Sequence, residues 1–439
     1  MTKYISILIT LVATSLFFFP FVFTFFPYAN TKMMLGAVGV VILLVNLAKK
    51  RLGRLDKDFL IISLFSLGVC LASYLSMTIN NTPDDSYLSY IISMWVWVSA
   101  AYVVVNMIKK THKYISVELV CFYLIGVGVA QCIIAVTMDT IPAVKHFVDG
   151  FLAGEGFMGK NKSRLYGIGC ALDVAGGRFA ALLIMISFLL PRMFRRKNYN
   201  KYVVSLIFSF FIISIIGNII GRTAMVGMVL GIAYIAYCLI FKQSYFYGKR
   251  NVFTSRISVI AIIVILVAVF LYNTNPHSKS LIRFGFEGFF SLVEKGRWEV
   301  HSNEMLKHGY IFPDTLKGWI IGDGYIGSTY NDPYYTGIDY IGFYKGTDVG
   351  YSRFIFYFGI IGLAAFALFL IKVCQVLMRR FPQYRLMFFG ILLLNFIVWL
   401  KVSTDLFLVF APFLCIGQSE EEEYESHIEK DIDELISET

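Results

Sequence analysis

The chain has 439 residues, of which 57% are hydrophobic and only 15% are charged, and its formal net charge is +10. Soluble domains contain about 45–50% apolar and about 25% charged residues, so this composition indicates a membrane protein and excludes an ordinary soluble domain. The charge is uneven, because the 21 residues from Ser419 to Thr439 contain ten acids and one Lys. The rest of the chain is strongly basic, which fits anionic lipid, an anionic substrate or the topology of a membrane protein.

Seven Cys and six His are scattered along the chain without a CxxC pair or an HExxH motif. We therefore expect no disulfide framework, no metal site and no cofactor. Lys3 precedes an apolar stretch from Tyr4 to Phe26 that is too long for a signal peptide and has no cleavage site after it. This stretch predicts an uncleaved first helix.

A helix needs roughly 20 apolar residues to span the hydrocarbon core of a bilayer. By this rule the sequence predicts an all-α polytopic fold of about twelve transmembrane helices, at 4–26, 31–48, 59–78, 88–108, 117–138, 178–194, 202–220, 223–241, 257–273, 354–371, 386–400 and 402–416. The last two are short and fit either a tilted pair or a re-entrant hairpin.

Lys and Arg cluster in alternate connections between these helices, as they do in cytoplasmic loops. The clusters begin at Lys49, Lys109, Arg192, Lys242 and Lys372, whereas the short loops on the opposite side contain only Lys32, Arg222 and Lys401. Both termini are therefore expected in the cytoplasm, and segments 139–177 and 274–353 outside, the second between the ninth and tenth helices. A membrane domain, 1–416, precedes an acidic cytoplasmic tail, 417–439, which we interpret as solvated or weakly helical rather than as a docking site for a partner.

The centres of the predicted helices contain no Asp, Glu, Lys, Arg or His. Ion-coupled transporters usually need an ionisable group near the middle of the membrane, so this absence argues against a transporter. The ionisable groups gather instead at the external helix ends and in the two external loops. We expect the function to be located there.

Arg222 lies in the stretch Ile219–Gly227, which joins two predicted helices almost without a loop. Glycines permit such a tight turn, and an Arg at the N-terminus of the next helix is suited to binding phosphate. The alternative is an Arg that extends to the membrane surface only to keep its charge in water, which the spacing alone favours slightly.

The second external loop contains three further features. Residues 295–306 have the pattern of an amphipathic helix, and Gly318–Gly327 is rich in glycine. Seven Tyr between 325 and 351 fit sugar stacking and interfacial belts equally well. Asp348 stands where the loop enters the tenth helix, where it fits either a general base or a helix cap.

These residues resemble motifs of the O-antigen ligase/polymerase family, membrane glycosyltransferases that move glycans from a polyprenyl-diphosphate carrier. Arg164–Gly167 is similar to the family's Arg-x-x-Gly stretch, and Gly221–Ala224 to its Ser-Arg-Gly-Ala turn. Residues 296–324 resemble the Arg-helix-GxG part of its large periplasmic loop. Residues 348–362 resemble the motif that closes this loop and the GxxG helix after it. The resemblance covers roughly residues 160–365.

The resemblance implies a C-type glycosyltransferase-like fold in the bacterial inner membrane and metal-independent, inverting glycosyl transfer at the periplasmic face. The donor would be an undecaprenyl-diphosphate-linked glycan and the acceptor a second glycan, with a chain-length regulator and a flippase as candidate partners and no nucleic acid. Ligases of the family commonly carry a His where this chain has Asp348, which favours a polymerase of O-antigen, capsule or exopolysaccharide repeat units.

Catalytic roles are then expected for Asp348, Arg222 and Arg297, because a diphosphate leaving group needs cations and the attacking hydroxyl needs a base. Substrate binding is expected of Arg164, Arg353, Tyr351, Glu299 and His301. Glu299, His301 and Glu304 are the alternative bases.

Three other functions stay open on the sequence. A ligase would transfer a finished glycan to a lipid or protein acceptor. A flippase of the same substrate would need polar groups along a path through the helices, which their centres do not supply. A purely structural scaffold would leave the external arginines unexplained.

Overall fold

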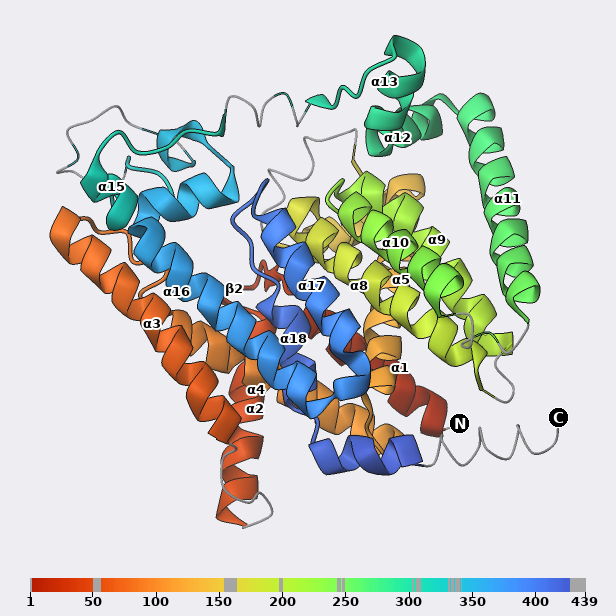
Figure 1. Cartoon of the computed structure of the whole chain (residues 1–439), viewed down its shortest axis with the longest axis horizontal. Coiled ribbons are helices and arrows are strands. Elements are labelled where there is room, and N and C mark those ends of the chain that lie inside the picture. The colour runs from red at the N-terminus through yellow and green to blue at the C-terminus, as the bar shows by residue number, and fades with distance from the viewer. Residues whose placement is uncertain are drawn as a thin grey trace. The chain divides into compact units, whose positions relative to one another are not determined.

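The structure is a computed structural model that describes residues 2–49, 57–153, 164–196, 200–242, 246, 249–301, 304, 309–330, 332, 335, 340 and 342–426 (Figure 1). The chain forms two compact units, which are considered separately. Unit 1 contains Met1–Gly39, Ala100–Phe290 and Ala411–Thr439, and unit 2 contains Val40–Ser99 and Ser291–Phe410.

Helices account for nearly all regular structure in the described residues. They are α1 (Thr2–Phe18), α2 (Thr31–Ala48), α3 (Lys57–Asn80), α4 (Tyr90–His112), α5 (Val117–Thr140), α6 (Pro142–Phe151), α8 (Leu172–Phe194), α9 (Asn200–Ile220), α10 (Ala224–Phe241), α11 (Arg250–Thr274), α12 (Pro276–Gly285), α13 (Glu287–Lys295), α15 (Leu316–Ile320), α16 (Gly350–Arg380), α17 (Arg385–Val398) and α18 (Phe407–Leu414). Two short strands, β1 (Val22–Phe23) and β2 (Phe26–Asn30), form an antiparallel pair.

Eight of these helices are long and apolar enough to cross a membrane, by length and composition: α3, α4, α5, α8, α9, α10, α11 and α16. The expectation of an all-α polytopic membrane protein is thereby confirmed. Every predicted range contains a helix, but α1, α2 and α17 are shorter apolar helices, and α18 has eight residues. At 1.5 Å per residue α18 is about 12 Å long, too short to span alone, so the count of twelve crossings stays a prediction.

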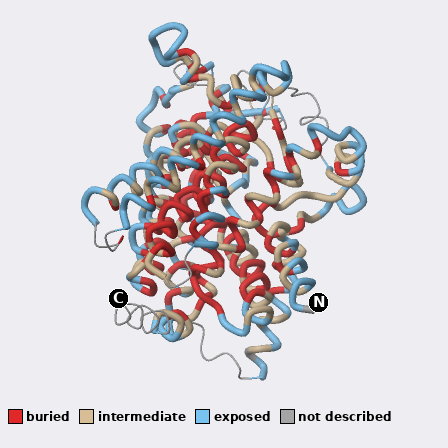
Figure 2. The backbone as a smooth tube through the Cα atoms, turned by 90° about the vertical axis from the view of Figure 1, so that its right-hand side faces the viewer, coloured by how far each residue is buried: buried red, intermediate tan, exposed pale blue. Residues whose placement is uncertain are grey.

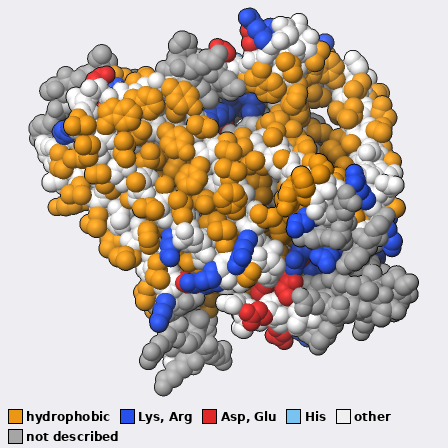
Figure 3. Space-filling model, viewed as in Figure 1, with side chains coloured by type: hydrophobic (Ala, Val, Ile, Leu, Met, Phe, Trp, Pro, Cys, Tyr) orange, Lys and Arg blue, Asp and Glu red, His pale blue; other side chains and the backbone are white. Residues whose placement is uncertain are grey.

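The apolar side chains that these helices present outward cover most of the face in Figure 3. Helix α11 is the extreme case, because only 6% of its most apolar window is buried inside the protein. A helix this apolar and this exposed is stable only if lipid covers it.

Unit 1 is built around α8, which packs against α5, α9 and α10 and is buried along most of its length (Figure 2). Close packing against α10 depends on Gly227, since a Cβ atom there would collide with the backbone of Ala180. The first helix ends at Phe18 instead of continuing to 26. Pro20 follows within two residues, where its ring and missing N–H disfavour a further helical turn, and the chain turns into the β1–β2 pair.

Unit 2 is built on α3 and α16, which pack along each other. Helix α16 covers the predicted tenth helix but is broken at Phe358 and Gly359, where Gly359 has φ 66° and ψ −169°. Only glycine adopts this conformation readily. A Cβ atom at Gly359 would also collide with the carbonyl oxygen of Ile320, so the break allows α15 to approach α16 closely.

The break also explains the glycine-rich segment of the long loop. The carbonyl oxygen of Phe356, freed from the helix, accepts hydrogen bonds from the backbone N–H groups of Asp323 (2.6 Å) and Gly324 (3.2 Å). Gly322 and Gly324 have φ values of 86° and 82°, which favour glycine. These two glycines therefore serve a turn in the fold. The amphipathic helix expected at 295–306 is not formed over its first part, because α13 ends at Lys295 and residues 296–300 are not helical. Of the remainder, 302–303 and 305–306 lie outside the described residues.

Candidate functional site

Two predicted arginines of unit 1 converge on one aromatic ring. The Cζ atom of Arg222 lies 4.6 Å from the centre of the Phe284 ring, and that of Arg164 lies 4.9 Å from the same centre. A guanidinium is attracted to the negative face of an aromatic ring, which holds both cations in place. The structure thus brings together two of the eight predicted site residues. We call Arg164, Arg222 and Phe284, with the acids described below, the arginine cluster.

The turn that carries Arg222 is as tight as its glycines predict. Helix α9 ends at Ile220 and α10 begins at Ala224, so three residues make the connection. A Cβ atom at Gly221 would collide with the carbonyl oxygen of Leu172, at the start of α8. Because this turn is pressed against α8, the position of the Arg222 backbone is fixed by packing. Its side chain retains 13% exposure.

A glutamine inside α5 positions the segment that follows Arg164. The side chain of Gln131 accepts a hydrogen bond from the N–H of Ile168 (2.9 Å) and donates one to the carbonyl oxygen of the same residue (2.9 Å). Gln131 lies nine residues before the end of α5, or about 13 Å along the helix axis. The segment after Arg164 therefore descends between the helices. Gln131, a polar exception in the sequence, anchors this loop.

Phe284 comes from α12, a short helix with clear start signals. Asn275 caps it by accepting hydrogen bonds from the N–H groups of His277 and Ser278, and Pro276 occupies the first turn. The His277 ring nitrogen lies 2.8 Å from a carboxylate oxygen of Asp139 at the end of α5. These contacts hold α12 over the ends of α5 and α9.

Two carboxylates complete the arginine cluster. Glu287, in the first turn of α13, forms an ion pair with the Nη1 atom of Arg222. Asp173, in the first turn of α8, accepts a hydrogen bond from the Thr223 hydroxyl (2.6 Å). Burial lowers the pKa of Arg164, an effect that Asp173 opposes and the charge of Arg222 reinforces. Arg stays protonated at any physiological pH, so the cluster holds two cations and two carboxylates.

In unit 2, the predicted site residue Arg353 contacts an aromatic ring and a backbone carbonyl group. Its Cζ atom lies 4.0 Å from the centre of the Phe343 ring, and its Nη2 atom donates to the carbonyl oxygen of Ile326 (3.1 Å). The charges of Asp348 and Asp84 both act on it. Asp84 also accepts hydrogen bonds from the N–H groups of Ile326 (2.8 Å) and Gly327 (3.3 Å). Asp84 and Arg353 therefore hold the same turn from two sides.

Asp348 is exposed just before α16 and does not cap this helix. The N-cap residue is Val349, whose N–H donates to the hydroxyl of Thr347 (3.2 Å), and no side-chain capping bond forms. The structure therefore disfavours the capping interpretation of Asp348. Its carboxylate is open to solvent and close enough for its charge to act on Arg353.

Arg297 and Glu299 pair with each other on the surface. The Nε atom of Arg297 lies 2.5 Å from a carboxylate oxygen of Glu299, which also accepts from Lys295 Nζ at 2.5 Å. The hydrogen bond from Lys295, followed by the nearby charge of Arg297, lowers the pKa of Glu299. A lowered pKa makes a carboxylate a weaker base, which disfavours Glu299 in that role. His301 is exposed beside this group.

Tyr351 and most of the described loop tyrosines have structural contacts. The Tyr351 hydroxyl donates to the carbonyl oxygen of Phe396 (3.0 Å), which ties the start of α16 to α17. Tyr325 and Tyr344 stack with ring centres 5.4 Å apart, and Phe356 lies beneath them in a small buried core. Sugar stacking would require open ring faces, and among the described tyrosines of this loop Tyr330 is the most exposed, at 72%.

Sequence reasoning missed Phe284, Glu287 and Asp173. Phe284 and Glu287 sit on α12 and α13, short helices whose ends are marked by Asn275-Pro276 and by Gly285, signals that could have located them. The sixth helix was predicted at 178–194, but the structure begins it at Leu172. Arg178 therefore lies inside α8, with its Cζ atom 5.6 Å from the centre of the Phe19 ring.

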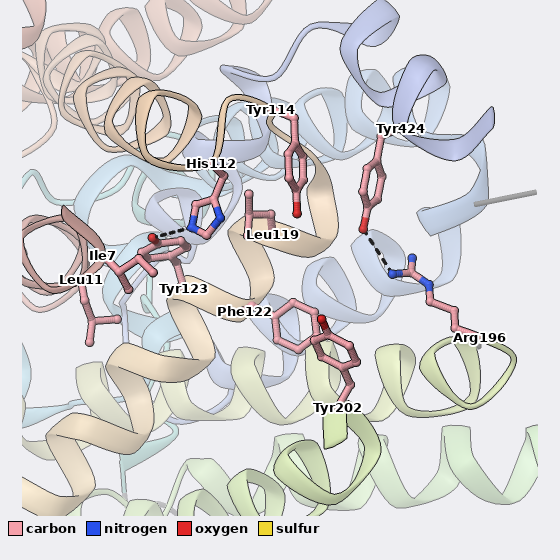
Figure 4. A pocket seen from close by; sticks show the side chains of 10 residues that line it. All are labelled: Ile7, Leu11, His112, Tyr114, Leu119, Phe122, Tyr123, Arg196, Tyr202 and Tyr424. Carbon is pink, nitrogen blue, oxygen red and sulfur yellow. Dashed lines mark hydrogen bonds between the residues drawn. The ribbon is translucent and has the colours of Figure 1, made fainter. Parts of the chain in front are cut away.

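Unit 1 has a pocket at the ends of its helices opposite the arginine cluster, beside bases of the predicted cytoplasmic loops (Figure 4). It has a volume of about 370 Å³ and is lined by Ile7, Leu11, His112, Tyr114, Leu119, Phe122, Tyr123, Arg196, Tyr202 and Tyr424. The rings of Tyr114 and Tyr424 stack with centres 5.5 Å apart, and Arg196 donates to the Tyr424 hydroxyl (3.2 Å).

Tyr424 of the acidic tail lines this pocket, and the described part of the tail packs beside it. Glu421 is buried and accepts the N–H of Val117 (2.7 Å) at the start of α5, while Tyr424 donates to Glu118 (3.0 Å). Glu420 pairs with Lys109 and Glu425 with Arg192. Residues 418–426 are helical, as the solvated or weakly helical interpretation allowed, but Glu421 is buried and its neighbours pair with bases, so this part of the tail is not simply solvated. The run of acids did not indicate this docking, because like charges favour a solvated chain unless bases elsewhere in the fold pair with them.

No group of three or more His, Cys, Asp or Glu suited to a metal ion occurs within the described ranges. Comparisons with protein-family models, with curated proteins and with solved structures give no match.

Proposed function

We propose that the protein is a polymerase of undecaprenyl-diphosphate-linked oligosaccharide repeat units, acting at the periplasmic face of a bacterial inner membrane with both termini in the cytoplasm. The observation that carries the proposal is the convergence of Arg164 and Arg222 on the Phe284 ring. Two guanidinium groups beside one ring suit a diphosphate, because each offers paired N–H donors in a planar fork.

The chemistry follows from this assignment. A hydroxyl oxygen of the acceptor sugar attacks the anomeric carbon of the donor from the face opposite the carrier, forming the new glycosidic bond. The bond between that carbon and the diphosphate oxygen breaks, and the carrier diphosphate leaves with the electron pair. Arg164 and Arg222 stabilise the negative charge that develops on it. Asp348 accepts the proton of the attacking hydroxyl, because its carboxylate is exposed and is not occupied in capping α16.

Arg353 and Arg297 have different parts in this proposal. Arg353 holds the turn at Ile326 and lies within the electrostatic reach of Asp348, so it is suited to orient the acceptor near the base. Arg297 is 74% exposed, so it remains accessible to a donor or acceptor glycan.

The test is a polysaccharide gel from a strain that lacks the protein. A polymerase predicts that single repeat units reach the final acceptor while the ladder of longer products disappears. Accumulation of lipid-linked polymer, with none transferred, would instead identify a ligase. An unchanged ladder would refute both glycosyltransferase functions. Repeat units trapped at the cytoplasmic face would identify a flippase.

A further inference from the structure

Arg222 already has an anionic partner, and that partner occupies the position a phosphate would need. The Nη1 atom of Arg222 is paired with the Glu287 carboxylate, and only 13% of the Arg222 side chain is exposed. A carboxylate and a phosphate compete for the same donors of a guanidinium, because both present oxygen atoms at matching spacing. An entering diphosphate therefore has to displace Glu287 from at least one of these donors.

The charges of the cluster lead to the same conclusion. Two arginines and two carboxylates sum to zero, so a diphosphate bound without rearrangement would leave a strongly negative site. Arg164 is half-buried, where an unbalanced charge is more costly than in water. The departure of one carboxylate reduces this imbalance.

The two carboxylates differ in how firmly they are held. Asp173 belongs to α8, the buried centre of unit 1, and is tied to Thr223 by a 2.6 Å hydrogen bond. Glu287 is in the first turn of α13, a nine-residue helix, and retains 34% exposure. Of the two, Glu287 can turn toward water with the smaller loss of packing.

We propose that Glu287 is an anion gate: its carboxylate occupies the diphosphate position on Arg222 and swings out when the carrier diphosphate binds. This inference rests on the proposed function, since it assigns the anion that Arg222 receives. In the resting protein the gate keeps the arginine side chain paired and in position. It also makes the site selective, because an anion with a single charge gains less from displacing Glu287 than a diphosphate does.

The test is binding of inorganic pyrophosphate to the purified full-length protein, measured by isothermal titration calorimetry. Glu287→Gln removes the competing charge and is expected to lower the dissociation constant for pyrophosphate by roughly 10- to 150-fold, the range for a hydrogen bond to a charged group. Glu294→Gln makes the same change of charge on the same helix and is expected to leave the constant within about twofold of wild type. Arg222→Ala is expected to abolish the gain when combined with Glu287→Gln.

An unchanged or weaker affinity in Glu287→Gln overturns the gate, as does an equal gain in Glu294→Gln, which would reduce the effect to overall charge. A gain that survives Arg222→Ala also overturns it, since the anion would then bind elsewhere. These outcomes are separate from the fate of the proposed function, because pyrophosphate binding is measured without any glycan. A gain in Glu287→Gln together with a normal polysaccharide ladder in the deletion strain would uphold the gate and refute the polymerase.

Discussion

Replacing Arg222 by Lys is expected to slow polymer formation while the protein remains folded. Lys keeps the positive charge but loses the planar fork that binds two oxygens at once. A hydrogen bond to a charged partner contributes about 1.5–3 kcal/mol, and each 1.36 kcal/mol is a factor of ten in rate, so the loss is roughly 10- to 150-fold. The contact with the Phe284 ring contributes about 2 kcal/mol at a largely buried site, and Lys keeps a cation beside the ring, so the substitution is not expected to unfold the chain.

The assay is the length distribution of polysaccharide on a gel, normalised to the amount of protein in the membrane by immunoblot. Arg256→Lys is a control, because Arg256 near the start of α11 also donates a hydrogen bond to a side chain, that of Asn200 (2.7 Å), but does not belong to the cluster. The control is expected to keep the wild-type ladder. Full activity in Arg222→Lys would show that only a general positive charge is needed, and the assignment of Arg222 to a diphosphate would be lost.

Three further predictions follow from single contacts. Asp348→Asn should lower polymer formation by about 10²–10⁴-fold with an unchanged Tm, because Asp348 makes no capping bond; an active variant would remove it as the base. Burial raises the pKa of Glu421 from 4.5 to about 8, so the contribution of Glu421 to tail docking is present at acidic pH and is lost as pH rises through 8. Between about pH 6 and 9, where the ion pairs of Glu420 and Glu425 stay charged, docking should therefore weaken. A spin label on Glu423→Cys should gain mobility over that range and lose the dependence in Glu421→Gln, whereas a flat wild-type profile would contradict the burial. Gly359→Ala should lower Tm, because it adds backbone strain of about 1–3 kcal/mol and a collision with Ile320. Gly68→Ala is the control and should not lower Tm, because its Cβ would meet nothing within 4 Å. Equal Tm values for the two variants would show that the break in α16 is not needed.

The positions of the helices could be predicted from the sequence because lipid imposes a simple rule. A spanning helix needs a long apolar run, and runs such as 117–138 and 202–220 are unmistakable. The tight turn at Arg222 was also predictable, because Gly221 stands beside an arginine between two such runs. These features depend only on local sequence.

Features that depend on tertiary contacts could not be predicted. The break at Gly359 gives no signal in an apolar stretch, because glycine is common in membrane helices and its φ value is set by the approach of Ile320. The pairing of Arg222 with Glu287 joins two elements 65 residues apart, across all of α10, α11 and α12. Nothing in the local sequence of either residue identifies the other.

In the candidate site, too, the features set by local sequence could be predicted and those set by tertiary contacts could not. Its arginines were found because charges at the ends of apolar helices are conspicuous and need a reason. The ring that holds two of them was not found, since Phe284 is one of 41 Phe in the chain. The loop tyrosines fitted sugar stacking and an interfacial belt equally well by sequence. Tyr325 and Tyr344 have a third role, because they bury their rings against each other and against Phe356.

The most direct test of the polymerase uses purified protein and the lipid-linked repeat unit that accumulates in the deletion strain. Incubated together in detergent, the two should yield a ladder of longer lipid-linked glycans, with one carrier diphosphate released for each repeat unit added. Protein with Arg222→Ala should yield none of these products. If the wild-type protein leaves the repeat unit unchanged under conditions in which it remains folded, the protein is not the polymerase.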